Sequence, residues 1–390
     1  MQQMLERNSQ KTWFIILLCG LPFSHFVFRY KDLWLCQGMY FQVGVLVLFC
    51  ISIWKNKVQN KPLALLTLWL GLVTSYFWWY VLVRYKQHAI LTFLPYFNFI
   101  CFVIFYKAAL WLKKEDIKKI LDFMTYSVFV VLCYCVLQVF WFDQFLTPLD
   151  NLTKHIQYRL VGTIGNTSHL AGYIALTLPL FYRWNSKLAK PAIYLAWGII
   201  LITGSTSGLL TAVIATVFYL IFYRPFRWYD IVLVGGFGLV VFAKKYGFDF
   251  GRLLLHYGSL SGRLEFWEYL VDTAKSQQGM AITGKGLGFL NTIAATDPFR
   301  TWRHAHCEYL HYWRELGFIG LGLIGYAIVD YFRIFKKSAN GVTEVTLASM
   351  MVGFLVLSAL SYPSHLWLLS SLGMVSYSFM YSIKGDRYGS

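Results

Sequence analysis

The chain has 390 residues, of which 57% are hydrophobic and only 14% are charged. Its mean hydropathy is +0.52, whereas about a quarter of the residues in a typical soluble domain are charged. This composition excludes an ordinary soluble protein. Apolar runs of nearly the length that crosses a bilayer recur along the chain, so we predict an all-α membrane protein with many spans.

The formal net charge of +17 has two interpretations. A basic surface can bind nucleic acid, but most Lys and Arg residues of this chain cluster in short breaks between apolar runs. That distribution is typical of the cytoplasmic loops of membrane proteins. We therefore expect contacts with membrane lipids and no nucleic-acid partner.

The apolar runs predict about 12 transmembrane helices in one membrane domain that covers residues 1–390. The alternation of basic and less basic breaks then puts both termini in the cytoplasm, as an even number of spans requires. The predicted spans are residues 12–29, 34–54, 62–83, 89–112, 119–142, 166–182, 188–204, 207–223, 228–243, 315–333, 343–361 and 365–383. The basic breaks on the predicted cytoplasmic side contain Lys55, Lys57, Lys61, Lys113, Lys114, Lys118, Lys119, Arg183, Lys187, Arg224, Arg227, Lys336 and Lys337.

The apolar runs stop between residues 244 and 315, and we predict a long periplasmic loop there that carries the active site. Residues 260–274 have apolar side chains at helical spacing, which predicts an amphipathic helix on the membrane surface or over the bundle. With Ser259 or Ser261 as the cap, Arg263 lies in the first turn, where free backbone N–H groups favour an anion. Further along the loop, a glycine-rich turn contains Gly284, Gly286 and Gly288.

Lys and Arg residues of membrane proteins are concentrated in cytoplasmic loops. The cations on the predicted periplasmic side therefore require a different explanation. Arg263 either contacts lipid headgroups, pairs with Glu265 or Glu268, or grips a phosphate or pyrophosphate with its bidentate guanidinium. Arg159 precedes a turn-rich stretch that opens a span, and it is either an interfacial anchor or a second headgroup contact.

Three histidines, His304, His306 and His311, approach the span that follows the loop. Their spacing on a helix forms no i, i+4 pair of metal ligands, and the chain has no D-x-D pair to hold a divalent ion against a pyrophosphate. We therefore expect no metal and no other cofactor. A histidine that titrates near neutral pH suits proton transfer from a sugar hydroxyl, which makes His306 the candidate base. The alternative is an interfacial histidine satisfied by the backbone.

Glu315 opens the next span but is too far round a continuous helix from His306 to orient it. We predict that Glu315 pairs with His311 at i, i−4, or else caps the span. Gly317 and Gly320 then allow the span to pack closely on a neighbour.

The hairpin TGSTSGLL puts Ser205, Thr206 and Ser207 on the predicted outer face. Their hydroxyls either contact a phosphate or a sugar, or belong to a tight Ser/Gly turn that only connects two spans. Both interpretations remain open.

Taken in order, these motifs resemble those of the O-antigen ligase and O-antigen polymerase superfamily of membrane glycosyltransferases. The resemblance covers roughly residues 159–330, and the motifs are YRLVGT, TGSTSG, SGRLEFW, GKGLG and HCEYL followed by ELGFIG. Members of that family take a glycan from undecaprenyl diphosphate on the periplasmic face of the bacterial cytoplasmic (inner) membrane. They pass it to lipid A-core or to a growing glycan, with inversion and without a metal.

The resemblance implies a role for each matching residue. Arg263 corresponds to the family's long-loop arginine and Arg159 to a further arginine, both of which hold the diphosphate. His306 corresponds to the proposed base, with Cys307 where the family usually has Asn. The family hairpin often reads S-R-G, whereas this chain has no arginine between Ser205 and Gly208. The missing cation leaves Arg159, or Arg84 and Lys86 on the same predicted face, to complete the diphosphate site.

Three alternatives follow. Ligase and polymerase share donor and motifs, and the short chain with compact loops favours the ligase. A transporter or flippase for lipid-linked sugars predicts buried mid-span charges and a repeated half, but the predicted spans are nearly free of charge and no repeat is evident. A peptidoglycan glycosyltransferase shares the donor chemistry but has no motif match in this chain.

Overall fold

The computed structural model describes residues 2–23, 40–45, 47, 89–140, 160, 162–223, 257–276, 280–287, 289–290, 305–338 and 341–388. Within these ranges every regular element is a helix and none is a strand, which confirms the all-α class. The elements are α1 (Gln2–Gly20), η1 (Leu21–Phe23), α5 (Ala89–Ala109), α6 (Lys114–Phe140), η3 (Gly162–Ile164), α7 (Thr167–Arg183), α8 (Ala189–Thr203), α9 (Thr206–Tyr223), α12 (Tyr257–Ser276), α13 (Met280–Thr283), α15 (Glu308–Ser338), α16 (Val342–Leu360), η4 (Pro363–His365) and α17 (Trp367–Tyr388).

Helices α5 to α9 and α15 to α17 lie on predicted spans. The first predicted span, 12–29, differs from the structure because α1 begins earlier, at Gln2. Hydropathy did not predict this start because the opening turns of α1 are polar. The predicted spans 62–83 and 228–243, and most of 34–54, fall outside the described residues. In the described part of the chain, α6, α9, α15 and α16 are long and apolar enough to cross a membrane. The total of about 12 spans stays a prediction.

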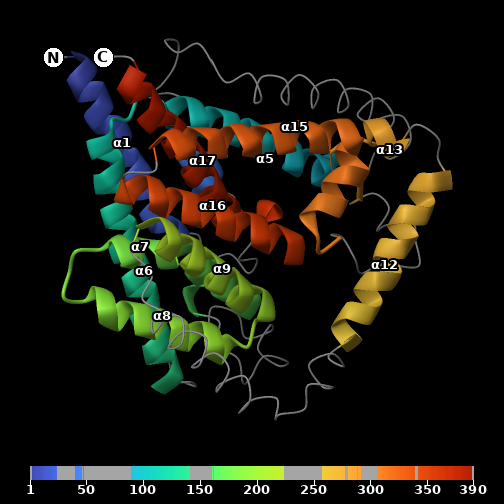
Figure 1. The fold of residues 1–390 in the computed structure, drawn as a ribbon, viewed down its shortest axis with the longest axis horizontal. Coiled ribbons are helices and arrows are strands. Elements are labelled where there is room, and N and C mark those ends of the chain that lie inside the picture. Colours follow the sequence, from blue (N-terminus) through green and yellow to red (C-terminus); the bar gives the residue numbers. More distant parts are fainter. Residues whose placement is uncertain are drawn as a thin grey trace.

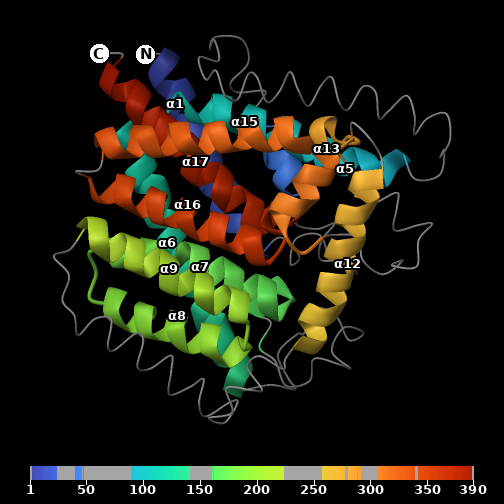
Figure 2. The same cartoon turned by 45° about the vertical axis from the view of Figure 1, so that its right-hand side comes forward.

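Helix α7 is the centre of the bundle. It packs against α6, α8, α9, α16 and α17, and all of its residues from Leu170 to Phe181 are buried. Figures 1 and 2 both show α7, α9 and α16 side by side. The side chain of Asn166 caps α7 by accepting hydrogen bonds from the backbone N–H groups of Ser168 and His169, at 2.9 and 3.1 Å. This cap fixes the first turn of the central helix.

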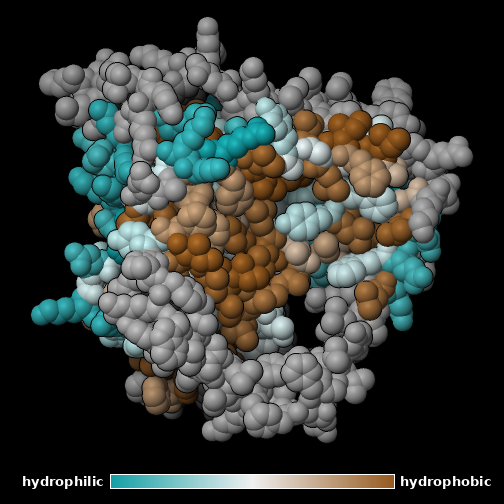
Figure 3. Space-filling view, viewed as in Figure 1, coloured by the Kyte–Doolittle hydropathy of each residue, from teal (hydrophilic) through white to brown (hydrophobic). Residues whose placement is uncertain are grey.

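The outer surface of the bundle is apolar and part of its interior is polar, the reverse of a soluble protein. On α6 the side chains of Phe123, Val130 and Phe140 are exposed. Buried serines instead join helices, since Ser376 Oγ donates to Leu347 O and Ser382 Oγ to Leu112 O, both at 2.6 Å. Figure 3 shows apolar side chains gathered across the middle of the visible face and hydrophilic ones toward its left side. This arrangement is that of a membrane protein.

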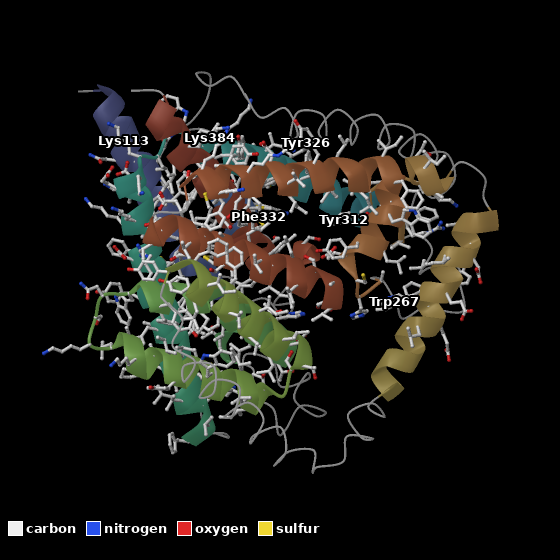
Figure 4. All side chains as sticks on the ribbon, in the orientation of Figure 1. Lys113, Trp267, Tyr312, Tyr326, Phe332 and Lys384 are labelled. Atoms are coloured by element: carbon white, nitrogen blue, oxygen red, sulfur yellow. The ribbon has the colours of Figure 1, made fainter. Side chains whose placement is uncertain are left out.

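One end of the bundle carries both termini and a set of ion pairs. Figures 1 and 2 show the two termini close together, and Figure 4 shows Lys113 and Lys384 at that end. The ion pairs there are Lys11–Asp116, Lys114–Glu344 and Arg183–Asp122. The breaks after α5 and after α7 therefore share one end with the termini, as the charge pattern predicts. The assignment of this end to the cytoplasm stays a prediction.

At the opposite end, α15 starts at Glu308, well before the predicted span, and is kinked at Gly317 (φ 69°, ψ −174°). The glycine-rich turn of the loop pairs with this kink through its backbone. The N–H groups of Lys285 and Gly286 donate to the carbonyl oxygens of Arg314 and Glu315, at 3.1 and 2.7 Å. The kink therefore makes two loop-to-helix hydrogen bonds possible.

The turn and the kink approach so closely that only glycine fits. A Cβ on Gly317 would lie 2.1 Å from the Ile282 carbonyl oxygen, and a Cβ on Gly284 would lie 2.4 Å from that of Glu315. The close packing predicted for Gly317 is thus confirmed, although its neighbour is the loop and not another span. A Cβ on Gly320 would instead meet the Leu316 side chain of its own helix.

We predict that Gly317→Ala destabilises the protein by at least about 1–3 kcal/mol, because the backbone conformation and the Ile282 contact both oppose a side chain. Thermal unfolding of the purified protein in detergent measures the effect. Gly322→Ala in the same helix is the control, since a Cβ there meets nothing within 4 Å, and it should be neutral or stabilising by about 1 kcal/mol. Equal melting temperatures for the two variants would contradict the close contact.

Candidate active site

His306 has a strained backbone. Its φ is 52°, and among the described residues no other non-glycine has a positive φ. This left-handed conformation costs a non-glycine residue on the order of 1 kcal/mol or more, so the surrounding contacts must hold it. His306 precedes α15 and is not helical. The helical spacing by which the sequence analysis related His306 to His311 and Glu315 therefore does not apply.

Helix α12 fixes the chain directly before His306. Ala305 is fully buried in a cluster with Phe266 and Leu270 of α12 and with Leu290. In addition, the Trp267 indole N–H donates a hydrogen bond to the Ala305 carbonyl oxygen. Figure 4 shows Trp267 on α12, at the end of the molecule away from Lys113. The predicted amphipathic helix therefore anchors the segment that leads into His306.

The His306 ring lies edge-on against Tyr362, with ring centroids 4.7 Å apart and an interplanar angle of 88°. The same tyrosine ring meets His169 of α7 edge-on, at 6.2 Å. Two imidazoles from distant segments thus flank one phenol ring. The sequence did not single out His169 or Tyr362. The only available signal was the Asn166 cap before His169, because nothing in the sequence near Tyr362 indicates a partner.

Arg263 lies inside α12, but not where the sequence puts it. The helix begins at Tyr257, so Ser259 and Ser261 are helical and the prediction of Arg263 in the first turn is wrong. Position 263 lies one helical turn before Phe266 and Trp267. Phe266 and Trp267 pack against the segment that precedes His306.

The hairpin hydroxyls have different surroundings. Ser205 is buried, and its Oγ accepts from Gly208 N and meets Ser207 Oγ, both at 3.2 Å. Ser205 thus caps α9, which is the structural interpretation of this turn. Thr206 is exposed and Ser207 partly exposed. Gly208 packs against Ala171 of α7, so the hairpin lies beside the helix that carries His169.

The remaining predicted cations, Arg84, Lys86 and Arg159, lie outside the described residues. Their contact with a diphosphate stays a prediction, as does substrate contact by Thr206 and Ser207. No group of three or more His, Cys, Asp or Glu residues in the described part of the chain is arranged to hold a metal ion.

Buried polar groups lock the first turns of α15. Glu308 Oε1 accepts from the Ser364 backbone N–H at 2.7 Å, and the Tyr312 hydroxyl donates to Ser364 Oγ at 2.6 Å. His311 Nε2 lies 3.2 Å from Glu315 Oε1, which confirms the predicted pair. These contacts tie α15 to η4, which follows Tyr362, so the two segments that carry the facing rings are joined.

Two further cations that the sequence did not single out lie beside the glycine-rich turn. Arg314 is only 1% exposed and is the largest fully buried side chain among the described residues. Lys285 is half-buried and its Nζ lies 4.4 Å from the Phe289 ring centroid. Burial and the neighbouring charge of Arg314 lower the pKa of Lys285 to about 8. The ammonium is still the main form at neutral pH.

The fold and site define a helical membrane protein in which a strained loop histidine faces a tyrosine at one end of the bundle. Residues 191–325 match the family model described as O-antigen ligase, a range that contains the hairpin, α12, His306 and the kink of α15. The matched range is about a third of the chain, and it lies within residues 159–330, where the ordered motifs resemble this family. No match is found among curated proteins.

We predict that His311 and Glu315 are energetically coupled by about 1–3 kcal/mol in a double-mutant cycle with His311→Ala and Glu315→Ala. Removing either partner leaves the other buried without its contact, so the double variant should be more stable than the sum of the single losses implies. Unfolding free energies in detergent measure the coupling. Glu268→Ala on the exposed face of α12 is the control and should change stability by less than about 0.5 kcal/mol. Strictly additive losses would contradict the pair.

Proposed function

We propose that the protein transfers a glycan from undecaprenyl diphosphate to an acceptor sugar on the periplasmic face of the bacterial cytoplasmic membrane. The preferred reaction is O-antigen ligation to lipid A-core. The observation that carries the proposal is the position of His306. It is held in a strained conformation by α12 and Tyr362, within the segment that matches the O-antigen ligase family.

In the proposed reaction, His306 takes the proton of the acceptor hydroxyl. The hydroxyl oxygen attacks the anomeric carbon of the donor sugar from the face opposite the diphosphate. The bond between this carbon and the diphosphate oxygen breaks, so the configuration inverts and undecaprenyl diphosphate leaves. No metal takes part in this proposal, and cationic side chains stabilise the developing charge. Arg263 and Arg159 are the proposed cations, with Arg84 as an alternative and Lys86, Thr206 and Ser207 as further substrate contacts.

The position of the site along the bundle supports a periplasmic reaction. His169 lies in the first turn of α7 and Arg183 ends the helix, which separates them by about 21 Å along the axis. Arg183 belongs to the end that carries the termini and the basic breaks, whereas His169 and His306 share the ring of Tyr362 at the other end. If the basic end is cytoplasmic, the site faces the periplasm.

The distribution of ionisable groups favours an enzyme over a transporter of lipid-linked sugars. In the described helices these groups gather toward the two ends of the bundle, as at Lys114, Arg183 and Glu344 on one side and Glu308 on the other. Asp330 lies further along α15 and accepts a hydrogen bond from Tyr381. An alternating-access carrier instead needs charges near the membrane midplane.

We predict that His306→Ala lowers glycan transfer by about 10²- to 10⁴-fold, because the acceptor loses its base. The measurement is transfer from a defined lipid-linked glycan by purified protein in the presence of EDTA. Lys187→Ala, an exposed residue near the other end of α7, should retain full activity. Undiminished transfer by His306→Ala would remove this residue from the mechanism, and loss of wild-type transfer in EDTA would remove the metal-free step.

The same assay tests the arginines. Arg263→Ala should lower transfer, because the leaving diphosphate loses a cation. Arg159→Ala and Arg84→Ala test which of the two replaces the hairpin arginine of the family. Full activity in both of these variants would mean that neither supplies the missing charge.

The surface polysaccharide of a deletion strain distinguishes ligase from polymerase. A ligase deletion should leave bare lipid A-core and accumulate lipid-linked polymer, since the last transfer is missing. A polymerase deletion should leave core capped with one repeat unit. We expect the first result, and gel analysis of the lipopolysaccharide measures it.

A further inference from the structure

Arg314 is a buried cation with no counter-ion among the described residues. In the described part of the chain its Nε and Nη2 have no hydrogen-bond partner, and no carboxylate lies within salt-bridge distance. The nearest acidic residues along α15 are engaged elsewhere. Glu315 Oε1 meets His311 and Leu290 N, and Glu308 Oε1 accepts from Ser364 N. A guanidinium buried in this way is unfavourable unless a further group pairs with it.

Lys285 places a second cation next to the first. Its backbone N–H donates to the Arg314 carbonyl oxygen at 3.1 Å, and its ammonium is close enough to Arg314 for the two charges to repel. Lys285 is half-buried whereas Arg314 is not exposed. An anion that approaches from solvent therefore meets Lys285 first and Arg314 behind it. Two neighbouring cations without an ion pair are a charge arrangement that suits a polyvalent anion.

Arg314 lies toward α12, the helix that also packs against the segment before His306. Position 314 follows Leu310 by one helical turn, and Leu310 packs in the cluster with Phe266 and Ala305. The Tyr269 hydroxyl of α12 interacts electrostatically with Arg314. Arg314 thus lies on the side of α15 that faces α12, and Figures 1 and 2 both show α12 and α13 beside the start of α15.

We propose that Arg314 and Lys285 form an anion subsite for the phosphate groups of the lipid-linked donor. The chemistry that the two residues recognise is a diphosphate, and its identity as the donor's diphosphate rests on the proposed function. The subsite supplies positive charge that the hairpin lacks. It also assigns a purpose to a buried charge that packing alone does not explain.

The test compares ligand affinity with stability in the full-length protein purified in detergent. Inorganic pyrophosphate and undecaprenyl diphosphate are the probes, and inorganic sulfate is the control anion. Arg314→Met removes the charge but keeps much of the volume, and Lys285→Met does the same at the second position. The matched controls are Arg333→Met and Lys187→Met, both exposed and remote from the subsite.

We expect Arg314→Met to weaken pyrophosphate binding by about ten- to hundredfold, and Lys285→Met to weaken it by about tenfold. Without ligand, Arg314→Met should melt at the same or a higher temperature than wild type, because an unpaired buried charge is gone. A purely structural arginine gives the opposite pattern, a lower melting temperature with unchanged affinity. That pattern, or pyrophosphate binding no tighter than sulfate binding in the wild type, would overturn the subsite.

The comparison of inorganic pyrophosphate with undecaprenyl diphosphate separates a free anion from the lipid-linked donor. Parallel losses for pyrophosphate and undecaprenyl diphosphate support the donor, whereas a loss for pyrophosphate alone overturns the assignment to the donor's diphosphate. If Arg314→Met does not fold, Lys285→Met decides by the same criteria. Neither measurement uses glycan transfer. The binding result for Arg314 and Lys285 is therefore independent of whether His306→Ala changes transfer activity.

Discussion

The arrangement of the site depends on one backbone contact, between the glycine-rich turn and the kink of α15. Gly284 and Gly317 approach closely enough to exclude a Cβ on either, and the turn donates two hydrogen bonds to the carbonyl groups just before the kink. The kink interrupts the long α15 at Gly317, so its first turns form a separate segment against α12 and η4. Glycine is required at both positions because the contact joins backbone to backbone, with no space for side chains.

The segment between the kink and His306 is rigid for a second reason. Several of its buried polar groups have partners, with Glu308 and Tyr312 on Ser364 and with Glu315 on both His311 and Leu290. Each such contact is strong only because water is excluded, and each is costly to break for the same reason. His306 follows a loop residue anchored by Trp267 and precedes this locked turn. Its strained φ is therefore held from both sides, which is the positioning that the proposed role as a proton acceptor would need.

Local patterns in the sequence predicted much of the bundle, and one contact of the site. Hydropathy located α5 to α9 and α15 to α17, and helical spacing predicted the pair of His311 and Glu315. Both are properties of neighbouring residues on one helix. The start of α12 was wrong, because Tyr257 and Gly258 carry no cap signal and the predicted serine caps lie inside the helix. The meeting of His169 and His306 on Tyr362 is set by how distant helices pack, which spacing along the chain does not encode.

The unpaired charge of Arg314 separates stability from function more sharply than any other feature of the site. A chain selected only for stability gains nothing from a buried guanidinium beside a second cation, since burial and repulsion both oppose it. Polar contacts are available in this segment, because one carboxylate oxygen of Glu308 and one of Glu315 have partners. Arg314 differs from these carboxylates because, in the described part of the chain, it has no partner of opposite charge. An enzyme that must stabilise a departing diphosphate without a metal needs fixed cations that are not neutralised by its own carboxylates. We propose that Arg314 and Lys285 meet that requirement, because neither side chain forms an ion pair within the described part of the chain, and the turn that carries Lys285 is joined to the Arg314 backbone beside the two glycines.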